Sequence, residues 1–403
     1  MLERYLMTDE QRDIVNMVRE FADKEVIPMA KEFDVPGTYP EALVKKAIDM
    51  GLTTMSLPEE YGGMGLDYVT YAMVKEELSR GDPGFGTTIG ASGLGFTPVK
   101  LAGSKEQMQQ VADVLTNGGL TAFGLTEADS GSDAASLKTT YVKDGDSYIL
   151  NGVKTFITNG GVASLYTIFA TKDRTLGPKG ISAFIVEAGT PGLSAGNHED
   201  KMGIRTSNTT EVILQDVRVP AKNMIGEEGT GFRTAMLTLN NTRPTAGAGA
   251  LGNAMFAYEY ALNYAQERKT FGKFIGQHQA VGFMLSDMAI QLEAARQLLY
   301  YAASLQNAGI MAPRVFSSSK AFCSDVGMKV CTDAVQVVGG FGYSREYPLE
   351  IVPVADVDHV PVVQREELTR IPLHVVARKV ALAADPVGVD RGLIPVEMYD
   401  HVP

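Results

Sequence analysis

Hydrophobic residues in the first part of the chain recur every three or four positions, which is the spacing of an amphipathic helix. Residues 14–22 form one such stretch and residues 43–50 another. Thr8 or Asp9 stands where a helix N-cap is expected, and Gly51 follows the last periodic residue of the second stretch. The pattern predicts helices from about residue 8 to about residue 118.

The middle of the chain has a different pattern, in which short apolar runs rich in β-branched and aromatic residues alternate with turn residues. Such runs favour strands, and the intervening Asp, Asn, Gly and Pro residues favour hairpins and tight connections. The sequence therefore predicts an all-β domain. The expected strands are Tyr148–Leu150, Tyr166–Ala170, Ile181–Val186, Glu211–Leu214 and Val217–Val219.

Helical spacing returns in the last part of the chain. The longest periodic stretches are Met236–Leu262, Ala280–Ala308 and Ala321–Val338. Helices, then strands, then helices indicate an α+β protein with a β domain between two helical ones. The expected boundaries are residues 1–119 for an N-terminal helical domain, 120–228 for a central β domain, 229–385 for a C-terminal helical bundle and 386–403 for an irregular tail.

Composition narrows the choice of partners. The chain has 403 residues and a formal charge of 36 − 48 = −12, and no run of Lys and Arg offers nucleic acid or an anionic membrane a local basic patch. Its two cysteines, Cys323 and Cys331, favour a reducing compartment and a role as small core residues. No apolar stretch is long enough to span a membrane. We expect a cytoplasmic protein, or one of the mitochondrial matrix if the chain is a mature eukaryotic one.

Few residues match a known catalytic pattern. The five histidines show no metal-ligand spacing, so we expect no metal site. Gly247–Gly252 spells G-x-G-x-x-G but lies in a helical stretch, which favours close helix packing over dinucleotide binding. In Phe123–Asp133, the hydroxyls of Thr126 and Ser132 are suited to a polar planar ligand, although a surface loop capped by Asp and Ser is the simpler interpretation.

Taken in order, these segments and several others resemble the acyl-CoA dehydrogenase family, with short-chain, butyryl-CoA-type members closest. The resemblance covers most of the chain between Pro58 and Pro348. The matching motifs are Pro58–Gly63, Leu125–Asp133, Asn151–Thr158, Lys201–Arg205, Arg268–Gly272 with Gln279, Gln336–Tyr343, and Glu346–Pro348.

The resemblance implies a helical domain, a β domain and a C-terminal four-helix bundle, assembled as a homotetramer. It also implies a flavoprotein oxidoreductase of fatty acid metabolism that binds FAD. Such an enzyme transfers the α-proton of an acyl-CoA thioester to a carboxylate and the β-hydride to flavin N5. Its electrons then pass to an electron-transferring flavoprotein. The same chemistry run in reverse would make the protein an enoyl-CoA reductase.

Residue by residue, the resemblance implies three groups of contacts. Phe156 stands where many members have Trp and would pack on the flavin ring. Ser132, Asn240 and Arg243 would bind the acyl-CoA. The other cofactor contacts would be Phe123, Leu125, Thr126 and Thr158 at the ring, Arg268, Phe271 and Gln279 from a second subunit at the diphosphate and adenosine, and Gln336, Gly339 and Gly340 opposite them.

Alternatives stay open for single residues. Seen alone, Arg268 would be a solvated helix residue and Gln336 a buried helix amide. Asp82 is an acid near the expected cleft, but a turn-capping role fits its Asp-Pro context better.

The resemblance ends after Glu350, where the motif that carries the family's catalytic Glu is altered. Counting backwards from Ala377-Arg-Lys379 places Glu366 at the base position, with Glu367 as the alternative. Such a base is needed because the α-proton of a thioester is a weak acid. An absent or relocated base would instead make the chain a flavin- and CoA-binding protein without dehydrogenase activity. A non-enzymatic helical scaffold is a third hypothesis.

Overall fold

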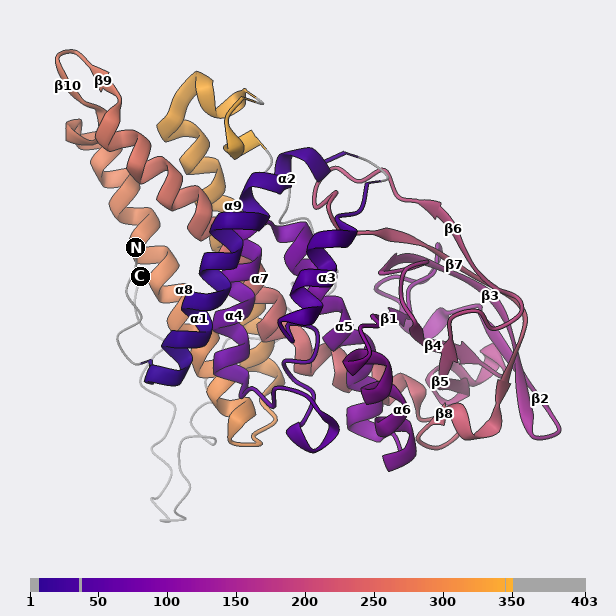
Figure 1. The fold of residues 1–403 in the computed structure, drawn as a ribbon. Helices are drawn as coiled ribbons and strands as arrows, with labels where there is room; N and C mark the ends of the chain where they lie inside the picture. Colours follow the sequence, from indigo (N-terminus) through magenta and orange to yellow (C-terminus); the bar gives the residue numbers. More distant parts are fainter. Residues whose placement is uncertain (1–6, 36–37, 345, 351–403) are drawn as a thin grey trace, which may run out of the picture. The chain divides into compact units, whose positions relative to one another are not determined.

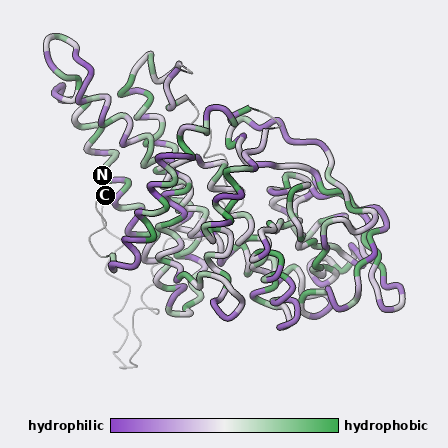
Figure 2. Tube along the Cα trace, in the orientation of Figure 1, coloured by the Kyte–Doolittle hydropathy of each residue, from purple (hydrophilic) through white to green (hydrophobic). Residues whose placement is uncertain are grey.

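The computed structural model describes residues 7–35, 38–344 and 346–350. Along the chain it shows helices, then a sheet, then three long helices (Figure 1). This order confirms the α+β prediction. Hydrophobic and hydrophilic segments alternate along the outer helices, as expected for helices with one buried face (Figure 2). Within the described ranges, no helix combines the length and apolarity that crossing a membrane requires.

The N-terminal helices begin and end where the sequence indicates. Thr8 caps the first helix through a capping box with Gln11, and Gly51, in the left-handed region at φ 79°, follows the end of the third. The helices are α1 (Asp9–Phe21), α2 (Ile27–Phe33), α3 (Glu41–Asp49), α4 (Tyr68–Gly81), α5 (Pro83–Ala102) and α6 (Lys105–Thr116), with a π-helical turn at Ala22–Val26.

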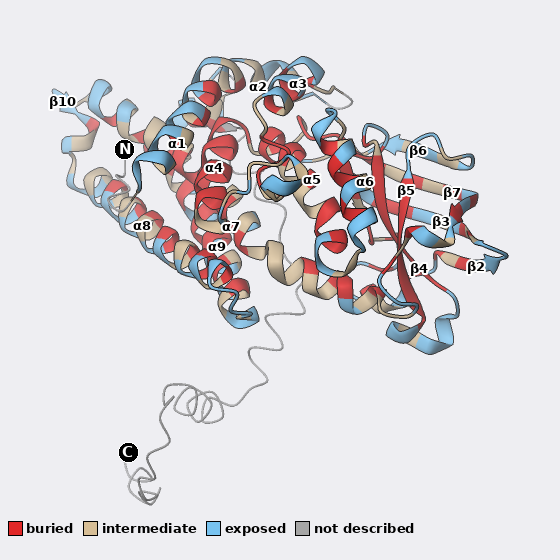
Figure 3. Ribbon diagram, turned by 60° about the horizontal axis from the view of Figure 1, so that its bottom comes forward, coloured by how far each residue is buried: buried red, intermediate tan, exposed pale blue. Residues whose placement is uncertain are grey.

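Helix α4 is buried on every side, although it carries several charged residues (Figure 3). Its charges are paired: Arg80 Nε lies 2.9 Å from Glu77, and Arg296 Nε lies 3.2 Å from Glu76. Asp82, which separates α4 from α5, accepts a hydrogen bond of 2.6 Å from the Phe85 amide. Asp82 is therefore the N-cap of α5, as its Asp-Pro context predicts.

The sheet has the strand order β6-β7-β3-β2-β4-β5-β8, and β1 pairs in parallel with β4. Two of the predicted strands, Glu211–Leu214 and Val217–Val219, are one strand that continues through Asp216 at φ 51°. The strands are β1 (Thr121–Gly124), β2 (Thr140–Asp144), β3 (Ser147–Thr158), β4 (Leu165–Thr171), β5 (Ile181–Glu187), β6 (Leu193–His198), β7 (Thr209–Pro220) and β8 (Met224–Ile225).

Strands β4 and β5 are buried on both faces. On one face, Phe169 and Ile185 pack with residues of α5 and α6, among them Phe96 and Val111. On the other face, residues of β3 and β7 close over the strands. The helical layer and the sheet thus share one core, which fixes α5 against the end of the sheet.

The C-terminal helices are α7 (Gly231–Glu267), α8 (Gln279–Asn307) and α9 (Pro313–Val338), with a small hairpin of β9 (Lys269–Thr270) and β10 (Lys273–Phe274) between the first two. Cys323 and Cys331 are fully buried in their core, as predicted. A fourth helix of the expected bundle, and the predicted tail, lie outside the described residues.

Close packing explains the glycines of Gly247–Gly252. A Cβ at Gly252 would overlap the carbonyl oxygen of Glu76 on α4, and a Cβ at Gly247 would lie 3.2 Å from the Lys320 Cα on α9. The prediction that this G-x-G-x-x-G segment serves helix packing is confirmed.

Candidate functional site

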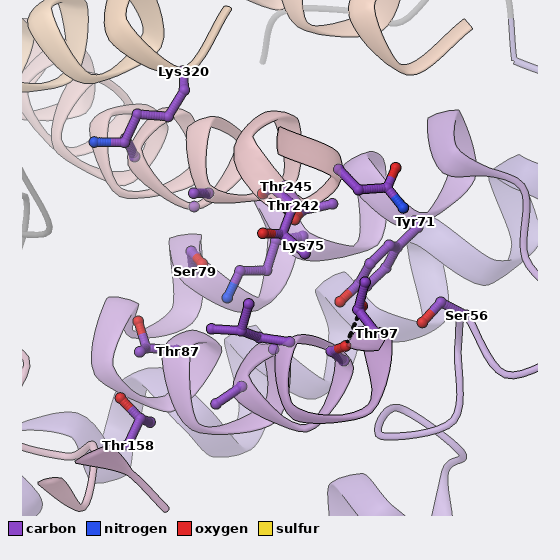
Figure 4. Close-up of a pocket in the computed structure, with 18 of the residues that line it drawn as sticks. Ser56, Tyr71, Lys75, Ser79, Thr87, Thr97, Thr158, Thr242, Thr245 and Lys320 are labelled. Atoms are coloured by element: carbon purple, nitrogen blue, oxygen red, sulfur yellow. Dashed lines mark hydrogen bonds between the residues drawn. The ribbon is translucent and has the colours of Figure 1, made fainter. Parts of the chain in front are cut away.

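A cavity of about 250 Å³ lies between α4, α5 and α7 (Figure 4). Helix α4 contributes Lys75 and Ser79, α5 contributes Thr87 and Leu94, and α7 contributes Thr245. Thr158, the last residue of β3, also lines the cavity, so the sheet and the helices meet at this point.

The edge of the sheet beside the cavity carries several of the residues predicted to bind the flavin. The Thr155 amide donates a 2.9 Å hydrogen bond to the carbonyl oxygen of Thr126, which joins the loop after β1 to β3. Thr126 and Thr158 are both half-buried. Leu125 is buried, and Phe123 packs on Phe169 at 5.0 Å between ring centroids. The structure therefore brings the predicted ring contacts into one region.

Phe156 has an unusual backbone. Its φ is 57°, in the left-handed region that a bulky residue rarely adopts, and the pairing of β3 with β7 is interrupted between Lys154 and Ile157. The break leaves Phe156 63% exposed, although its neighbours in the strand are buried. Strained, exposed aromatic residues are characteristic of ligand sites, because the strain persists only where something compensates for it.

A buried ion pair lies next to this edge of the sheet. Lys154 Nζ lies 2.7 Å from Glu127 Oε1 and 3.2 Å from the Leu125 carbonyl oxygen, with the lysine side chain 0% exposed. Burial lowers the pKa of Lys154 to about 8, although Glu127 acts in the opposite direction. Burial alone would raise the pKa of Glu127, but Lys154 and the hydrogen bonds from Thr139 and Lys138 together hold that pKa below its ordinary value.

The end of β3 is also fixed to α5. The side-chain amide of Asn159 donates hydrogen bonds to the Thr88 carbonyl oxygen at 3.1 Å and to the Thr121 carbonyl oxygen at 3.3 Å. Since Asn159 follows Thr158 directly and has a φ of 63°, these bonds determine where the Thr158 side chain enters the cavity.

The residues predicted at the diphosphate and adenosine lie elsewhere. They surround the β9–β10 hairpin and the end of α9, at the side of the helices away from β3 (Figure 1). Phe271 is 96% exposed at φ 50°, and the Arg268 guanidinium lies 5.7 Å from the Phe341 ring. All six are exposed in one chain: Arg268, Phe271, Gln279, Gln336, Gly339 and Gly340.

The exposure of Gln336 and Arg268 bears on the alternative interpretation of each residue. Gln336 is exposed, so the alternative of a buried helix amide is wrong. Arg268 caps the end of α7 and is exposed, as the alternative of a solvated residue requires, and this exposure equally fits a contact with another chain.

The predicted acyl-CoA contacts do not line the cavity themselves. Arg243 and Asn240 are half-buried on α7 and hydrogen-bonded to each other, and burial lowers the pKa of Arg243. Their neighbours Asn241 and Thr242 do line it. Ser132 is exposed in the loop after Glu127.

Glu366 and Glu367, predicted as the catalytic base and its alternative, lie outside the described residues. The described residues around the cavity include no Asp or Glu. Thr242, which lines the cavity, has no titratable group.

Sequence reasoning did not identify Lys75 and Ser79. They belong to Lys75-Glu-Glu-Leu-Ser-Arg80, whose many charges resemble a solvent-exposed helix face. The only available signal was their spacing of four residues, which places both side chains on one face of a helix.

Comparisons with known proteins agree with this arrangement. Three family models match the chain in order: "Acyl-CoA dehydrogenase, N-terminal domain" over residues 8–119, "Acyl-CoA dehydrogenase, middle domain" over 122–217 and "Acyl-CoA dehydrogenase, C-terminal domain" over 229–352. Fold and site thus define a helix–sheet–helix oxidoreductase. The chain belongs to the acyl-CoA dehydrogenase family, whose cofactor is FAD.

Individual relatives match nearly their whole length. An "Acyl-CoA dehydrogenase" of Bacillus subtilis (strain 168) is 44% identical over 346 residues, which is 85% of this chain and 91% of the relative. The structure of butyryl-CoA dehydrogenase from Megasphaera elsdenii has a TM-score of 0.85 at 40% identity and covers 88% of this chain and 94% of its own. A third match is a chain in a structure described as "Electron transferring flavoprotein of Acidaminococcus fermentans: Towards a mechanism of flavin-based electron bifurcation". It has a TM-score of 0.88 at 42% identity, and the match covers 95% of this chain and 100% of that chain.

The residues at the sheet edge fit a flavin. Phe156 offers an aromatic surface, and Thr126 and Thr158 offer hydroxyl and backbone groups beside it. Within the described part of the chain, the buried Thr155 hydroxyl has no hydrogen-bond partner. Buried polar groups are rarely left in this state, so a bound polar ligand near Thr155 would satisfy it.

Proposed function

We propose that this enzyme removes hydrogen from the α- and β-carbons of a short acyl-CoA thioester. The observation that carries the proposal is the cavity that runs from Thr158 at the sheet to α4. Its volume of about 250 Å³ is below the roughly 300–1,000 Å³ of pockets for drug-sized ligands. A short acyl chain fits such a volume better than a long one.

We infer that the flavin ring binds at the sheet edge. Phe156 stacks on the ring, Thr126 and Thr158 donate hydrogen bonds to it, and Phe123 and Leu125 complete its edge. When bound, FAD supplies the acceptor for the hydride that leaves the β-carbon. The Lys154–Glu127 pair positions Thr126, because Lys154 binds the carbonyl of the residue before it.

The diphosphate and adenosine require a second chain in this proposal. In one chain, Arg268, Phe271 and Gln279 surround the β9–β10 hairpin and the start of α8, at the side of the helices away from β3 (Figure 1). Arg268 offers the cation that a diphosphate favours. In a homotetramer these residues would reach the ring site of a neighbour, with Gln336, Gly339 and Gly340 opposite.

An exposed apolar row on α8 supports self-association. Phe283, Ile290 and Tyr301 are 61%, 66% and 56% exposed, and their spacings of 7 and 11 residues place all three on one helix face. We infer that this aligned row contributes to the interface with a second subunit.

Arg243 and Asn240 are proposed to bind the CoA portion, with Ser132 nearer the thioester. Asn240 holds the Arg243 guanidinium through its side-chain oxygen. A half-buried guanidinium offers several fixed N–H donors, which suits the phosphates and amides of CoA.

Glu366 is the proposed base, with Glu367 as the alternative. Proton abstraction needs a carboxylate, and the described cavity lining supplies none. We expect Glu366→Gln to retain FAD but to slow flavin reduction by roughly 10²–10⁴-fold, whereas Glu367→Gln slows it little. The reverse pattern would make Glu367 the base.

The named relatives bear on partners and alternatives. The similarity to a chain in a structure whose description names an electron-transferring flavoprotein supports such a protein as the electron acceptor. The relatives are named as dehydrogenases, which disfavours a protein that only binds flavin and CoA. They are bacterial, which favours the cytoplasm over the mitochondrial matrix. Flux in the direction of reduction remains a second proposal for the same site.

The direct test is reconstitution of the purified protein with FAD and assay with butyryl-CoA and an artificial electron acceptor. We expect a yellow protein that forms crotonyl-CoA. A colourless protein that cannot take up FAD would contradict the proposal.

A further inference from the structure

The cavity contains a buried lysine in its wall. Lys75 and Ser79 lie one turn apart on α4, both are buried, and both line the cavity. In Figure 4 the Lys75 ammonium points into the space between Ser79 and Thr87. Burying a charge is costly unless polar groups surround it, so the groups next to this ammonium determine what the cavity can bind.

Glycines on the neighbouring helices leave room for the Lys75 side chain. The ammonium donates a hydrogen bond to the Gly86 carbonyl oxygen. A Cβ at Gly90 would lie 2.8 Å from Lys75 Nζ, and a Cβ at Gly249 would lie 3.5 Å from its Cε. Helices α5 and α7 therefore both leave room for the lysine, and the ammonium position is fixed by packing.

Ser79 adds a second polar group at the same place. Ser79 is 1% exposed, and within the described residues its buried hydroxyl has no hydrogen-bond partner. A Cβ at Gly249 would lie 3.4 Å from this hydroxyl, so the serine reaches the same space as the lysine. Buried hydroxyls are normally hydrogen-bonded, and an oxygen of a ligand would satisfy this one.

The positive charge of the cavity lining favours an anionic ligand. In a chain of charge −12, the described residues around the cavity include Lys75, Lys100 and Lys320 and no acidic residue. Of these 23 residues, 15 have polar side chains and eight are Gly, Ala, Pro or Leu. The excess of lysines over acidic residues in this lining favours an anionic group at the end of the acyl chain.

We propose that the acyl chain of the substrate ends in a carboxylate, which the Lys75 ammonium and the Ser79 hydroxyl bind. An ammonium has three N–H donors, so Lys75 can bind the Gly86 carbonyl and a carboxylate oxygen together. The inference rests on the proposed function and specifies its substrate class as a short dicarboxylic acid monothioester. Lys75 is then a specificity-determining residue.

The test measures binding without turnover. Two CoA thioethers that cannot be dehydrogenated, S-(4-carboxybutyl)-CoA and S-pentyl-CoA, are titrated calorimetrically into the FAD-loaded enzyme. We expect the carboxylate compound to bind at least tenfold more tightly. In Lys75→Met, which keeps an unbranched side chain but removes the ammonium, this preference should disappear, and Ser79→Ala should reduce it about threefold.

Lys100→Met is the matched control, since Lys100 lines the cavity but is exposed and donates to the Ser56 carbonyl. The Lys100→Met enzyme should still prefer the carboxylate compound. Loss of the preference in Lys100→Met would mean that general positive charge, and not Lys75, selects the ligand, and this result would overturn the proposal. Tighter binding of S-pentyl-CoA by the wild-type enzyme would also overturn it, as would an unchanged preference in Lys75→Met. The wild-type comparison does not depend on any variant folding.

The two proposals fail differently. If S-pentyl-CoA binds as tightly as its carboxylate partner and butyryl-CoA is oxidised, only the carboxylate inference is wrong. If neither thioether binds and no acyl-CoA is oxidised, the proposed function is wrong as well.

Discussion

The Lys154 ammonium and the Glu127 carboxylate form an ion pair of 2.7 Å within the sheet edge that carries Thr126 and Thr158. Glu127 also accepts hydrogen bonds from the backbone amides of Lys138 and Thr139, the latter at 2.9 Å. One carboxylate thus connects the loop after β1, the start of β2 and the middle of β3. The pair fixes the local backbone of the proposed flavin site.

We therefore expect Lys154→Met to lower the free energy of unfolding by about 3–5 kcal/mol, because the variant leaves the Glu127 charge buried without its cation. The double variant Glu127→Gln/Lys154→Met should lose less than the single variant. Urea unfolding measures both. A cost below about 1 kcal/mol for Lys154→Met would show that the pair does not hold this edge.

Asp82 predicts a pH dependence of stability. Burial raises its pKa to about 6, although hydrogen bonds from Thr206 and the Phe85 amide act in the opposite direction. The unfolded carboxyl loses its proton near pH 4 and the folded one near pH 6, so the folded state binds more protons between these values. This contribution to stability is complete below about pH 4 and is lost as the pH rises to about 6.

Asp82→Asn should remove that dependence while retaining the cap, since Asn and Asp are equivalent N-caps. Relative to the variant, the wild type should lose about 3 kcal/mol between pH 4 and pH 7, as expected for a shift of about two pKa units. Urea unfolding at several pH values measures the difference, with Asp146→Asn as a surface control. A constant difference across this range would contradict the assignment.

Much of the fold follows from local sequence signals, and the exceptions have physical reasons. The periodic helices and the buried strands β4 and β5 match the predictions, because one period or one apolar run dominates each of them. Helix α4 gave no clear period, since every face is buried and its charges find partners within the protein. Strands β2 and β6 are largely exposed and polar, so they contain no apolar run.

The candidate site also contains residues that the sequence identified and residues that it did not. Family motifs identified the residues at the sheet edge, where Phe156 and Thr158 share one strand end. Lys75 and Ser79 could not be found by motif, because their importance depends on Gly86, Gly90 and Gly249 from two other helices.

We expect a substitution of Phe156 to change FAD affinity without changing the stability of the folded protein. A left-handed backbone costs a non-glycine residue roughly 1–2 kcal/mol, so Phe156→Gly should leave the stability of the FAD-free protein within about 1 kcal/mol of wild type. The same change should weaken FAD binding roughly tenfold, since it removes the aromatic surface. Fluorescence titration with FAD measures this, and Phe156→Trp should bind within about threefold of wild type. Equal FAD affinity in Phe156→Gly would exclude Phe156 from the ring site.

Gly252 predicts a packing effect at the interface of α4 and α7. A Cβ there would overlap the Glu76 carbonyl, which belongs to a buried backbone. Gly252→Ala should therefore lower the free energy of unfolding by about 1–3 kcal/mol, despite the better helix propensity of Ala. Gly131→Ala is the control, because a Cβ at Gly131 would meet nothing within 4 Å. Thermal unfolding distinguishes the two, and equal melting temperatures would contradict the packing assignment.

The central claim is that the acyl chain in the α4–α5–α7 cavity delivers its β-hydride to a flavin held at Phe156 and Thr158. The most direct measurement is anaerobic stopped-flow absorbance at the flavin band after mixing the FAD-loaded protein with butyryl-CoA, either unlabelled or deuterated at the β-carbon. We predict loss of the flavin band within the mixing experiment and a severalfold slower loss with the deuterated substrate. A flavin band that persists with every short acyl-CoA would contradict the account.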